Sequence, residues 1–425
     1  MNLQSRSDSL SGWLARLEQA HPTTIELGLE RVAKVRDTLA LHPAFPVILV
    51  GGTNGKGSTC AFLEAILRAQ GYKTGLYTSP HLLRYNERVR INGAETSDAE
   101  IAAGLSAVQA ARGDVSLSYF EHGTLGAVWQ FVQADVDVAI LEVGLGGRLD
   151  AVNIFDPVVS VVTTIDLDHQ DWLGDTREAI GYEKAGIFRA GKPAVCGDYH
   201  PPQSLLTHAS QIGAALHCAE RDFSARAGSQ TWDFHMSERV LNALPLPSLT
   251  GAHQIQNATT ALAALALIGE TLPVSLEALH LGLVAASQAG RFQRIAQHPD
   301  VVLDVAHNPE SARALAANLS AYPVKGKNLA VLAMLADKDA VGVIEPLKAI
   351  FDAWFVGGLA GLRGQTGERL AQIVKPKVRA PVFVYSTPME AYRAARLQAD
   401  EGDRITVFGS FHTVAEILPD ATSSC

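Results

Sequence analysis

The residues best suited to chemistry lie between Gly51 and Thr59, where the sequence reads GGTNGKGST. Four glycines surround one lysine, Lys56, and the hydroxyl residues Ser58 and Thr59 follow it. Backbone N–H groups in such a turn can approach phosphate oxygens closely, and a helix N-terminus favours their negative charge. Lys56 supplies a cation, and a hydroxyl side chain can reach Mg²⁺. The stretch therefore predicts a site for a nucleoside triphosphate.

A strand and a helix are expected to position this turn. Four consecutive apolar residues, Val47 to Val50, are typical of a strand buried on both faces of a parallel sheet. Apolar residues then recur at helical spacing from Phe62 to Leu67. The loop departs from the common Walker pattern, which would need a glycine at Val50 and a hydroxyl residue at Gly57. Glycine-rich turns also serve simple packing, but the flanking strand and helix favour nucleotide binding.

Three further polar residues stand near or just beyond the ends of predicted strands. They are Ser79 after residues 74–78, Glu142 within residues 136–143 and His169 after residues 157–165. Ligands of a doubly wound sheet bind beyond the carboxyl ends of its strands. Their shared position therefore groups these three residues with the glycine-rich loop.

Two of these residues leave an alternative open. A buried carboxylate is costly unless a metal, an arginine or hydrogen bonds compensate it. Glu142 is therefore expected either to bind Mg²⁺ or to pair with Arg148. Because Mg²⁺ prefers oxygen ligands, chemistry alone favours Asp166 or Asp168 over His169 as its ligand.

The order of apolar segments predicts two α/β domains. Strand and helix patterns alternate through the first part of the chain, which predicts a doubly wound parallel sheet. Short polar strand-like pieces follow over residues 223–249, and βα alternation restarts after Gly290. We expect a nucleotide-binding domain over residues 1–289 and a smaller, Rossmann-like α/β domain over residues 290–425.

Composition narrows the class of protein. A net charge of −9 over 425 residues argues against a nucleic-acid-coating surface. The four cysteines are scattered without a C-x-x-C pair, so we expect a reduced compartment and neither zinc nor disulfides. The N-terminus lacks a signal-peptide core and no apolar run approaches 18 residues in length. The sequence thus predicts a cytoplasmic protein with no membrane or nucleic-acid partner, and we expect a monomer.

Nine motifs, spread over residues 50–413, resemble those of folylpolyglutamate synthases in the Mur ligase superfamily. More narrowly, they resemble the bifunctional bacterial dihydrofolate synthase/folylpolyglutamate synthases. In order, they read GTNGKGS, YTSPHLLRYNERVRING, SYFEHGTL, ILEVGLGGRLDAVN, DHQDWLG, EKAGIF, GRFQ, DVAHNP and GSFHT. The resemblance implies a Mur-ligase-like fold, with an ATP- and pterin-binding domain followed by a glutamate-ligase domain.

The resemblance also assigns roles to individual residues. It places Mg²⁺ on Ser79, Glu142 and His169, which overrides the preference for an aspartate. It places the ATP phosphates on the loop Thr53, Asn54, Gly55, Lys56, Gly57 and Ser58. It places the rest of the nucleotide on Asn257, Arg291, Asp304 and His307, and the pterin on Ser118, Tyr119, Phe120, Leu149, Asp150 and Ala151. Lys56, Lys184 and His307 are the implied catalytic residues.

Two of these assignments have a structural alternative. Asp150 could accept hydrogen bonds from the pterin or cap the turn that follows it. Lys184, in EKAGIF, matches the position of a carbamylated lysine in this family and in several Mur ligases. The alternative is a lysine at a helix end, facing the helix dipole.

The implied chemistry is ATP-dependent amide formation. ATP would phosphorylate a substrate carboxylate, and the amine of L-glutamate would displace phosphate from the acyl phosphate. Dihydropteroate would give dihydrofolate, and tetrahydrofolates would give folylpolyglutamates. The motifs leave open an enzyme with only the second activity, and a requirement for a monovalent cation such as K⁺.

Two other classes of protein fit less well. A peptidoglycan Mur ligase would need an N-terminal domain for its UDP sugar, and only residues 1–45 precede the phosphate-loop strand. A non-catalytic nucleotide-binding protein would be expected to have lost Lys56, Glu142 or His169, and all three are present.

Overall fold

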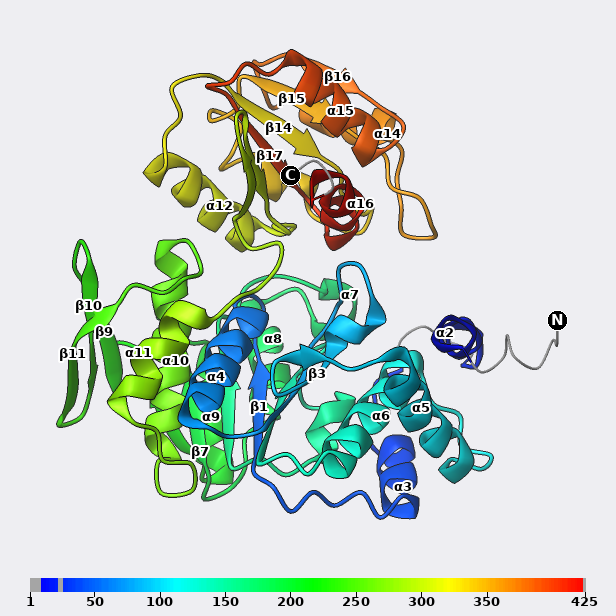
Figure 1. Cartoon of the computed structure of the whole chain (residues 1–425), viewed down its shortest axis with the longest axis vertical. Coiled ribbons are helices and arrows are strands. Elements are labelled where there is room, and N and C mark those ends of the chain that lie inside the picture. The colour runs from blue at the N-terminus through cyan, green and yellow to red at the C-terminus, as the bar shows by residue number, and fades with distance from the viewer. Residues whose placement is uncertain (1–8, 22–25, 423–425) are drawn as a thin grey trace. The chain divides into compact units, whose positions relative to one another are not determined.

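The computed structural model describes residues 9–21 and 26–422, and the chain divides into two compact units (Figure 1). The first comprises Met1–Ser248 and Ile255–Ser287, and the second comprises Leu249–Gln254 and Gln288–Cys425. The short segment Leu249–Gln254, which is grouped with the second unit, includes the first residues of the helix Ala252–Leu267. Cys60, Cys196 and Cys218 carry free thiols, whereas Cys425 lies outside the described residues.

An eight-stranded sheet forms the centre of the first unit, in the order β4-β3-β2-β5-β1-β6-β7-β8. Six strands are parallel, and β3 and β4 add an antiparallel hairpin at one edge. The bounds are β1 Val47–Gly51, β2 Thr74–Tyr77, β3 Val89–Ile91, β4 Ala94–Glu95, β5 Val138–Glu142, β6 Val159–Val162, β7 Pro193–Cys196 and β8 Ala215–Cys218. The chain winds outward from β1 in both directions, as a doubly wound sheet requires.

Helices cover both faces of this sheet. Val47 and Leu49 of β1 join a buried cluster with Phe131 of α6. Successive strand residues point to opposite faces, so Ile48 and Val50 face the other layer, where α4 packs on β1, β2 and β5. The helices are α2 Leu10–Gln19, α3 Glu30–Thr38, α4 Lys56–Gln70, α5 Asp98–Ala111, α6 Tyr119–Gln133, α7 Gln170–Leu173, α8 Arg177–Ala185, α9 Gln203–Ile212, α10 Ala252–Leu267 and α11 Leu276–Ala285.

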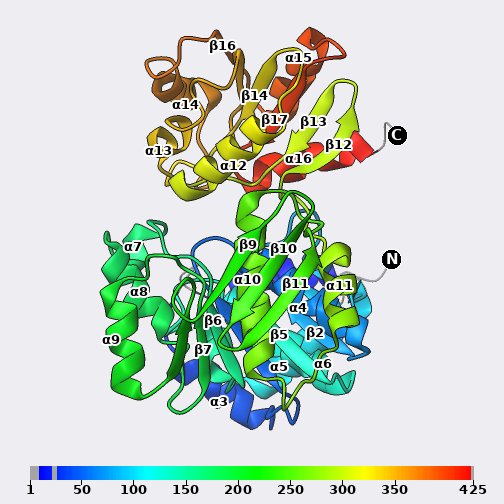
Figure 2. The same cartoon turned by 90° about the vertical axis from the view of Figure 1, so that its left-hand side faces the viewer.

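A small antiparallel sheet accounts for the polar segment 223–249. Its strands are β9 Phe223–Ala227, β10 Thr231–Met236 and β11 Arg239–Pro245, with β10 in the middle. Trp232, Phe234 and Met236 alternate along β10 and are buried, which gives the sheet one apolar face. The sheet lies beside α10 and α11 in both views (Figure 2).

The second unit is a six-stranded α/β sheet in the order β12-β13-β17-β14-β15-β16. Only β12 runs antiparallel to its neighbour. Its own core is built on residues such as Trp354 and Phe408. The strands are β12 Gln293–Gln297, β13 Asp300–Leu303, β14 Asn328–Leu332, β15 Ala353–Val356, β16 Val382–Val384 and β17 Arg404–Phe408. The helices are α12 Pro309–Ala321, α13 Ala340–Ile344, α14 Gly367–Val374, α15 Pro388–Gln398 and α16 Phe411–Thr422.

Local sequence signals explain several helix boundaries. Ser97 caps α5 through the Glu100 backbone N–H, and the Glu100 carboxylate accepts a hydrogen bond from the Ser97 N–H at 2.7 Å. Ser118 and Glu121 form the same reciprocal cap on α6. In the described part of the chain, no helix is both long and apolar enough to cross a membrane.

Candidate active site

The glycine-rich loop connects the end of β1 to the start of α4, as its sequence predicts. Gly55 has φ +84°, a left-handed conformation that suits glycine, and it precedes Lys56 at the helix start. A Cβ on Gly55 would lie 2.3 Å from Oδ1 of Asn257, so the buried Asn257 of α10 packs directly on the loop. A Cβ on Gly52, with φ +142°, would lie 1.9 Å from Oγ1 of Thr163. The glycines therefore permit close packing on both sides of the loop.

The segment after β6 holds the loop in place. The Thr53 N–H donates to the Thr164 carbonyl at 2.6 Å, and the Thr163 hydroxyl donates to the Asn54 carbonyl at 2.5 Å. The Thr53 hydroxyl also donates to the Asp166 carbonyl and accepts from the Asp166 N–H, each at 3.1 Å. These hydrogen bonds hold the loop, which the sequence predicts to bind the ATP phosphates, in a defined position without a bound phosphate.

Two lysines meet at one carbonyl oxygen of the loop. Lys56 donates from Nζ to the carbonyls of Gly52 and Thr53, at 3.1 Å each. Lys184, at the end of α8 and only 4% exposed, donates from Nζ to the same Gly52 carbonyl at 2.9 Å. The two candidate catalytic lysines of the first unit are thus brought together. Ser58 follows Lys56 in the first turn of α4 and is buried.

The residues proposed as metal ligands lie at the ends of neighbouring strands. Glu142 is the last residue of β5, is 5% exposed, and pairs in register with Val50 of β1. Its Oε2 accepts a hydrogen bond from the Ser79 N–H at 3.1 Å, which joins the ends of β5 and β2. Arg148, the alternative partner of Glu142, forms its ion pair with Glu183 instead, at 2.8 Å.

His169 lies past β6, on the other side of β1. It has φ +53° and directly precedes the short helix α7, and its side chain is 39% exposed. Its N–H donates to Oδ1 of Asp168 at 2.8 Å. Within the described residues, no group of three or more His, Cys, Asp or Glu side chains could hold a metal ion. The proposed set contains only two such side chains, so the hydroxyl of Ser79 and solvent or phosphate oxygens would have to complete it.

An ion pair that sequence reasoning missed holds the segment between Thr164 and His169. Asp198 accepts a hydrogen bond from the Ile165 N–H at 2.7 Å, and Arg177 donates from Nε to the Ile165 carbonyl at 2.8 Å. Arg177 and Asp198 also contact each other at 3.1 Å. Asp198 comes two residues after β7, at the same edge of the sheet. That position, a carboxylate just past a strand, is the signal that could have identified it.

The two stretches proposed to contact the pterin adjoin each other. Phe120 of α6 packs against the turn after β5, because a Cβ on Gly144 would lie 2.7 Å from its ring. Its ring centroid is 5.8 Å from that of Tyr77. Tyr119 stands edge-on to Tyr85, and the Arg88 guanidinium lies over both of their rings. Ser118 and Ala151 are buried, and Leu149 precedes Asp150 in the turn.

Asp150 has three backbone donors within the fold. Its Oδ2 accepts from the N–H groups of Gly144 and Leu145, and its Oδ1 accepts from that of Val152, at distances between 2.9 and 3.1 Å. Burial raises the pKa of its carboxyl to about 6, although these hydrogen bonds and the charge of Lys56 oppose the rise. The contacts favour the capping role, and its contact with the pterin stays a prediction.

The candidate residues of the second unit cluster at the end of β13. Asp304 follows β13 and accepts hydrogen bonds from the N–H groups of Phe292 and Ala306. Burial raises its pKa, and the charge of Arg291 opposes this. The rings of His307 and Phe411 lie 6.2 Å apart, and the Arg291 guanidinium lies 5.6 Å from the Phe411 ring centroid. Nδ1 of His307 donates to the Val305 carbonyl at 2.8 Å. Arg291, Asp304 and His307 are therefore brought together.

Comparison with known proteins gives a consistent result. The sequence matches the Mur ligase middle domain over residues 50–265 and the Mur ligase, glutamate ligase domain over residues 290–411. It is 46% identical to the dihydrofolate synthase/folylpolyglutamate synthase of Escherichia coli, over 96% of this chain and 94% of that protein. The corresponding protein of Haemophilus influenzae is 41% identical over 98% of each chain.

Solved structures match over almost the whole chain. The Escherichia coli FolC complex with DHPP and ADP superposes with a TM-score of 0.93 at 45% identity, and covers 99% of each chain. A bifunctional folylpolyglutamate synthase/dihydrofolate synthase with Mn, AMPPNP and L-glutamate bound has a TM-score of 0.91 at 47% identity, over 98% of each chain.

Proposed function

Because the chain belongs to the Mur ligase family, among its dihydrofolate synthase/folylpolyglutamate synthases, we propose that the residues around Lys56 form an active site at the carboxyl ends of the strands. This site catalyses the joining of L-glutamate to folate-type carboxylates. The protein is an ATP-dependent acid–amino-acid ligase. Its substrates are dihydropteroate, which becomes dihydrofolate, and tetrahydrofolates, which become folylpolyglutamates.

The reaction needs the carboxylate to be activated first. A carboxylate oxygen attacks the γ-phosphorus of ATP, the bond to ADP breaks, and an acyl phosphate results. The amine of glutamate then attacks the acyl carbon, and inorganic phosphate leaves as the amine loses a proton. Lys56 would stabilise the charge on the transferring phosphoryl group, and the loop N–H groups would orient it.

A divalent cation fits the oxygen groups at the strand ends. The Ser79 N–H donates to the buried carboxylate of Glu142 at the end of β5, and His169 lies past β6, on the other side of β1. These three residues would hold the cation, which we infer to be Mg²⁺, and it would supply charge neutralisation for the phosphates. The related structures contain Mn, which supports a divalent metal.

The remaining assignments extend the same proposal. Thr53 to Ser58 bind the ATP phosphates, and Asn257, Arg291, Asp304 and His307 contact the rest of the nucleotide. Residues 118–120 and 149–151 contact the pterin.

We further propose that residues 1–289 bind ATP and pterin, and that residues 290–425 form the glutamate-ligase domain. We also propose that the protein is a cytoplasmic monomer without a nucleic-acid partner. A K⁺ requirement is tested by replacing K⁺ with Na⁺ in the assay below.

One observation carries the proposal most directly: Lys56 and Lys184 both bind the Gly52 carbonyl, beside the strand that ends at Glu142. The test is an ADP-release assay with purified protein, ATP, Mg²⁺, glutamate, and either dihydropteroate or tetrahydrofolate. Release with both pterins establishes the two activities. Release with tetrahydrofolate alone supports a folylpolyglutamate synthase only, and no glutamate-dependent release with either would overturn the proposal.

A further inference from the structure

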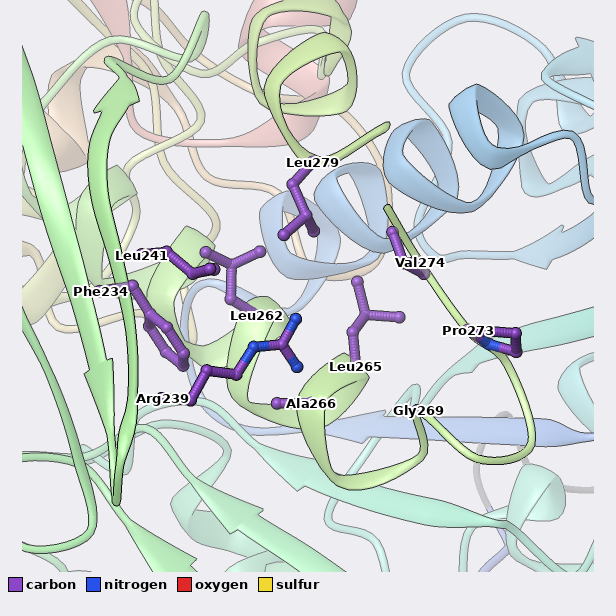
Figure 3. Close-up of a pocket in the computed structure, with 10 residues that line it drawn as sticks. All are labelled: Phe234, Arg239, Leu241, Leu262, Leu265, Ala266, Gly269, Pro273, Val274 and Leu279. Carbon is purple, nitrogen blue, oxygen red and sulfur yellow. The ribbon is translucent and has the colours of Figure 1, made fainter. Parts of the chain in front are cut away.

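A cavity of about 140 Å³ lies away from the candidate active site, between the small antiparallel sheet and the helices α10 and α11 (Figure 3). Most of the side chains that line it are apolar, and they come from four parts of the chain: Phe234 and Leu241 on the sheet, Leu262 and Leu265 on α10, Pro273 and Val274 before α11, and Leu279 on α11. None of these residues belongs to the proposed catalytic, nucleotide, metal or pterin sets. The cavity lies entirely within the first unit.

The size of the cavity suits one small ring or a short branched chain. An apolar cavity of about 150 Å³ lined by Leu, Ile and Phe stays dry and takes up benzene. Most of the side chains that line the cavity are of the same kind, with Arg239 as the charged exception, so the cavity is expected to favour an apolar body of that size. A large polar ligand such as a nucleotide or a pterin would not fit the volume.

Arg239 adds a charged group to this apolar site. It is the first residue of β11, and in Figure 3 its guanidinium points between Leu262 and Leu265 of α10. Arg239 is exposed, and across the described residues no hydrogen bond or ion pair involves its side chain. Its donors are therefore available, and a guanidinium pairs best with a planar carboxylate through two parallel hydrogen bonds.

We propose that this cavity is a second binding site, for a small monocarboxylate with an apolar body such as a single aromatic ring. The ring occupies the space among the leucines and the carboxylate pairs with Arg239. The competing interpretation is that the arginine only covers the apolar walls with its methylene groups. The two interpretations differ in whether a carboxylate is needed for binding.

The two helices that carry part of these walls also contact the phosphate loop and the helix that follows it. α11 packs so closely on α4 that a Cβ on Gly282 would lie 2.5 Å from Cα of Ile66. Asn257, near the start of α10, packs on Gly55. Because these contacts link the two regions, the titration is done on protein saturated with ADP and Mg²⁺, so that benzoate binding in the cavity is not confused with binding at the nucleotide site.

The experiment uses benzoate as the probe and the leucine methyl groups as reporters. The full-length protein is labelled with ¹³C on its leucine methyls and titrated with benzoate in the presence of ADP and Mg²⁺. Benzyl alcohol, which keeps the ring and lacks the charge, and acetate, which keeps the charge and lacks the ring, are the matched ligands. Arg239→Gln removes the charge, and Ala266→Phe fills the cavity from a half-buried position on α10.

We expect benzoate to shift the methyl signals of Leu262, Leu265 and Leu279, with both acetate and benzyl alcohol at least about tenfold weaker. Arg239→Gln should weaken benzoate binding by about tenfold or more, and Ala266→Phe should abolish the shifts. Both variants should keep the wild-type ADP-release rate, which shows that they fold. Equal binding of benzyl alcohol and benzoate, unchanged binding by Arg239→Gln, or no shift of these methyls at millimolar benzoate would each overturn the proposal.

Discussion

At the scale of single residues, the position of Lys56 supports a direct role in phosphoryl transfer. Its ammonium donates hydrogen bonds to two carbonyls of the same loop that is expected to bind the ATP phosphates. We expect Lys56→Ala to lower the rate of ADP release by at least about a hundredfold, because a positioned charge at the transition state is removed. The exposed Lys34→Ala is the matched control and should keep the wild-type rate. A folded Lys56→Ala protein with near-normal turnover would contradict the ATP-site assignment.

Lys184 raises a different question, because two ammonium groups donate to one carbonyl oxygen. Like charges at short range repel, and the repulsion is stronger in a buried site. Addition of CO₂ to Lys184 would replace one cation with an anion, which favours the carbamylated lysine predicted from EKAGIF.

We expect Lys184→Ala to lose most of its turnover and to regain part of it when a short carboxylate such as acetate is added. Wild-type protein equilibrated with ¹³C-bicarbonate should show a carbamate ¹³C signal that is absent from the variant. If Lys184→Ala stays fully active, the lysine serves only as a helix-end contact and the carbamate is not needed.

Asp150 leads to a prediction about stability and pH. Burial raises the pKa of its carboxyl to about 6, from an ordinary value of 3.8. Between about pH 4 and about pH 6, the folded chain therefore holds a proton that the unfolded chain has released. The contribution of Asp150 to the free energy of unfolding is present at low pH and falls as the pH rises through this range, by about 3 kcal/mol in total.

Asp150→Asn does not titrate, so it provides the reference. We expect the melting temperature of the wild type, relative to that of Asp150→Asn, to fall between pH 4 and pH 7. The same unfolding transition must be compared in both proteins, because a chain with two compact units need not unfold in one step. A difference in melting temperature that does not vary with pH would show that Asp150 titrates normally.

At the scale of elements, periodicity and glycine spacing predict the parts of the site that belong to one strand and one turn. The loop between β1 and α4 follows from GGTNGKGST, and β1 begins at Val47, as its apolar run predicts. Strand order cannot be predicted from local periodicity, because it depends on contacts between segments that are distant in the sequence. β5 lies between β2 and β1, and nothing local in the sequence indicates this.

The parts that sequence reasoning missed are polar or short. The hairpin β3–β4 lies in an arginine-rich stretch without a continuous apolar run, and it pairs with the edge of the main sheet. β8 was also missed, because its four residues include a histidine and carry no clear alternation. The Arg177–Asp198 pair forms only when α8 and β7 come together, so its partners lie 21 residues apart without a motif.

This pair leads to a prediction about the segment that carries His169. Arg177 and Asp198 hold both backbone polar groups of Ile165, which lies between the residues that fasten the phosphate loop and the proposed metal ligand. We expect Arg177→Leu to weaken binding of Mn²⁺ in the presence of ADP by about tenfold, while the overall fold persists. Electron paramagnetic resonance measures free Mn²⁺ directly and does not depend on turnover.

The control for Arg177→Leu is Arg221→Leu, which breaks an exposed ion pair with the neighbouring Asp222. It should leave Mn²⁺ binding unchanged, because exposed pairs contribute little. Arg177→Lys keeps the charge but cannot contact Ile165 and Asp198 in the same forked geometry, so it should restore binding only in part. Equal Mn²⁺ affinity in Arg177→Leu and the wild type would show that the pair does not position the metal site.

At the scale of the whole molecule, two reactions are assigned to one chain. Each compact unit has its own sheet and its own buried core. The glycine-rich loop with Lys56 and Glu142 belongs to the first unit, and the described residues contain a single such loop. Both reactions therefore have to use the same ATP-binding residues, with only the carboxylate substrate exchanged.

A shared site makes the two pterin substrates competitors. With both dihydropteroate and tetrahydrofolate present at saturation, we expect a total ADP-release rate between the two separate rates, since one active site can process only one carboxylate at a time. Each substrate should act as a competitive inhibitor of the other, with an inhibition constant equal to its own KM where binding is fast. Lys56→Ala should lower both activities by the same factor. The rates are measured by ADP release, and the two products are separated by chromatography. Rates that add when the substrates are mixed would require two independent sites and would contradict the assignment of both reactions to the edge of one sheet.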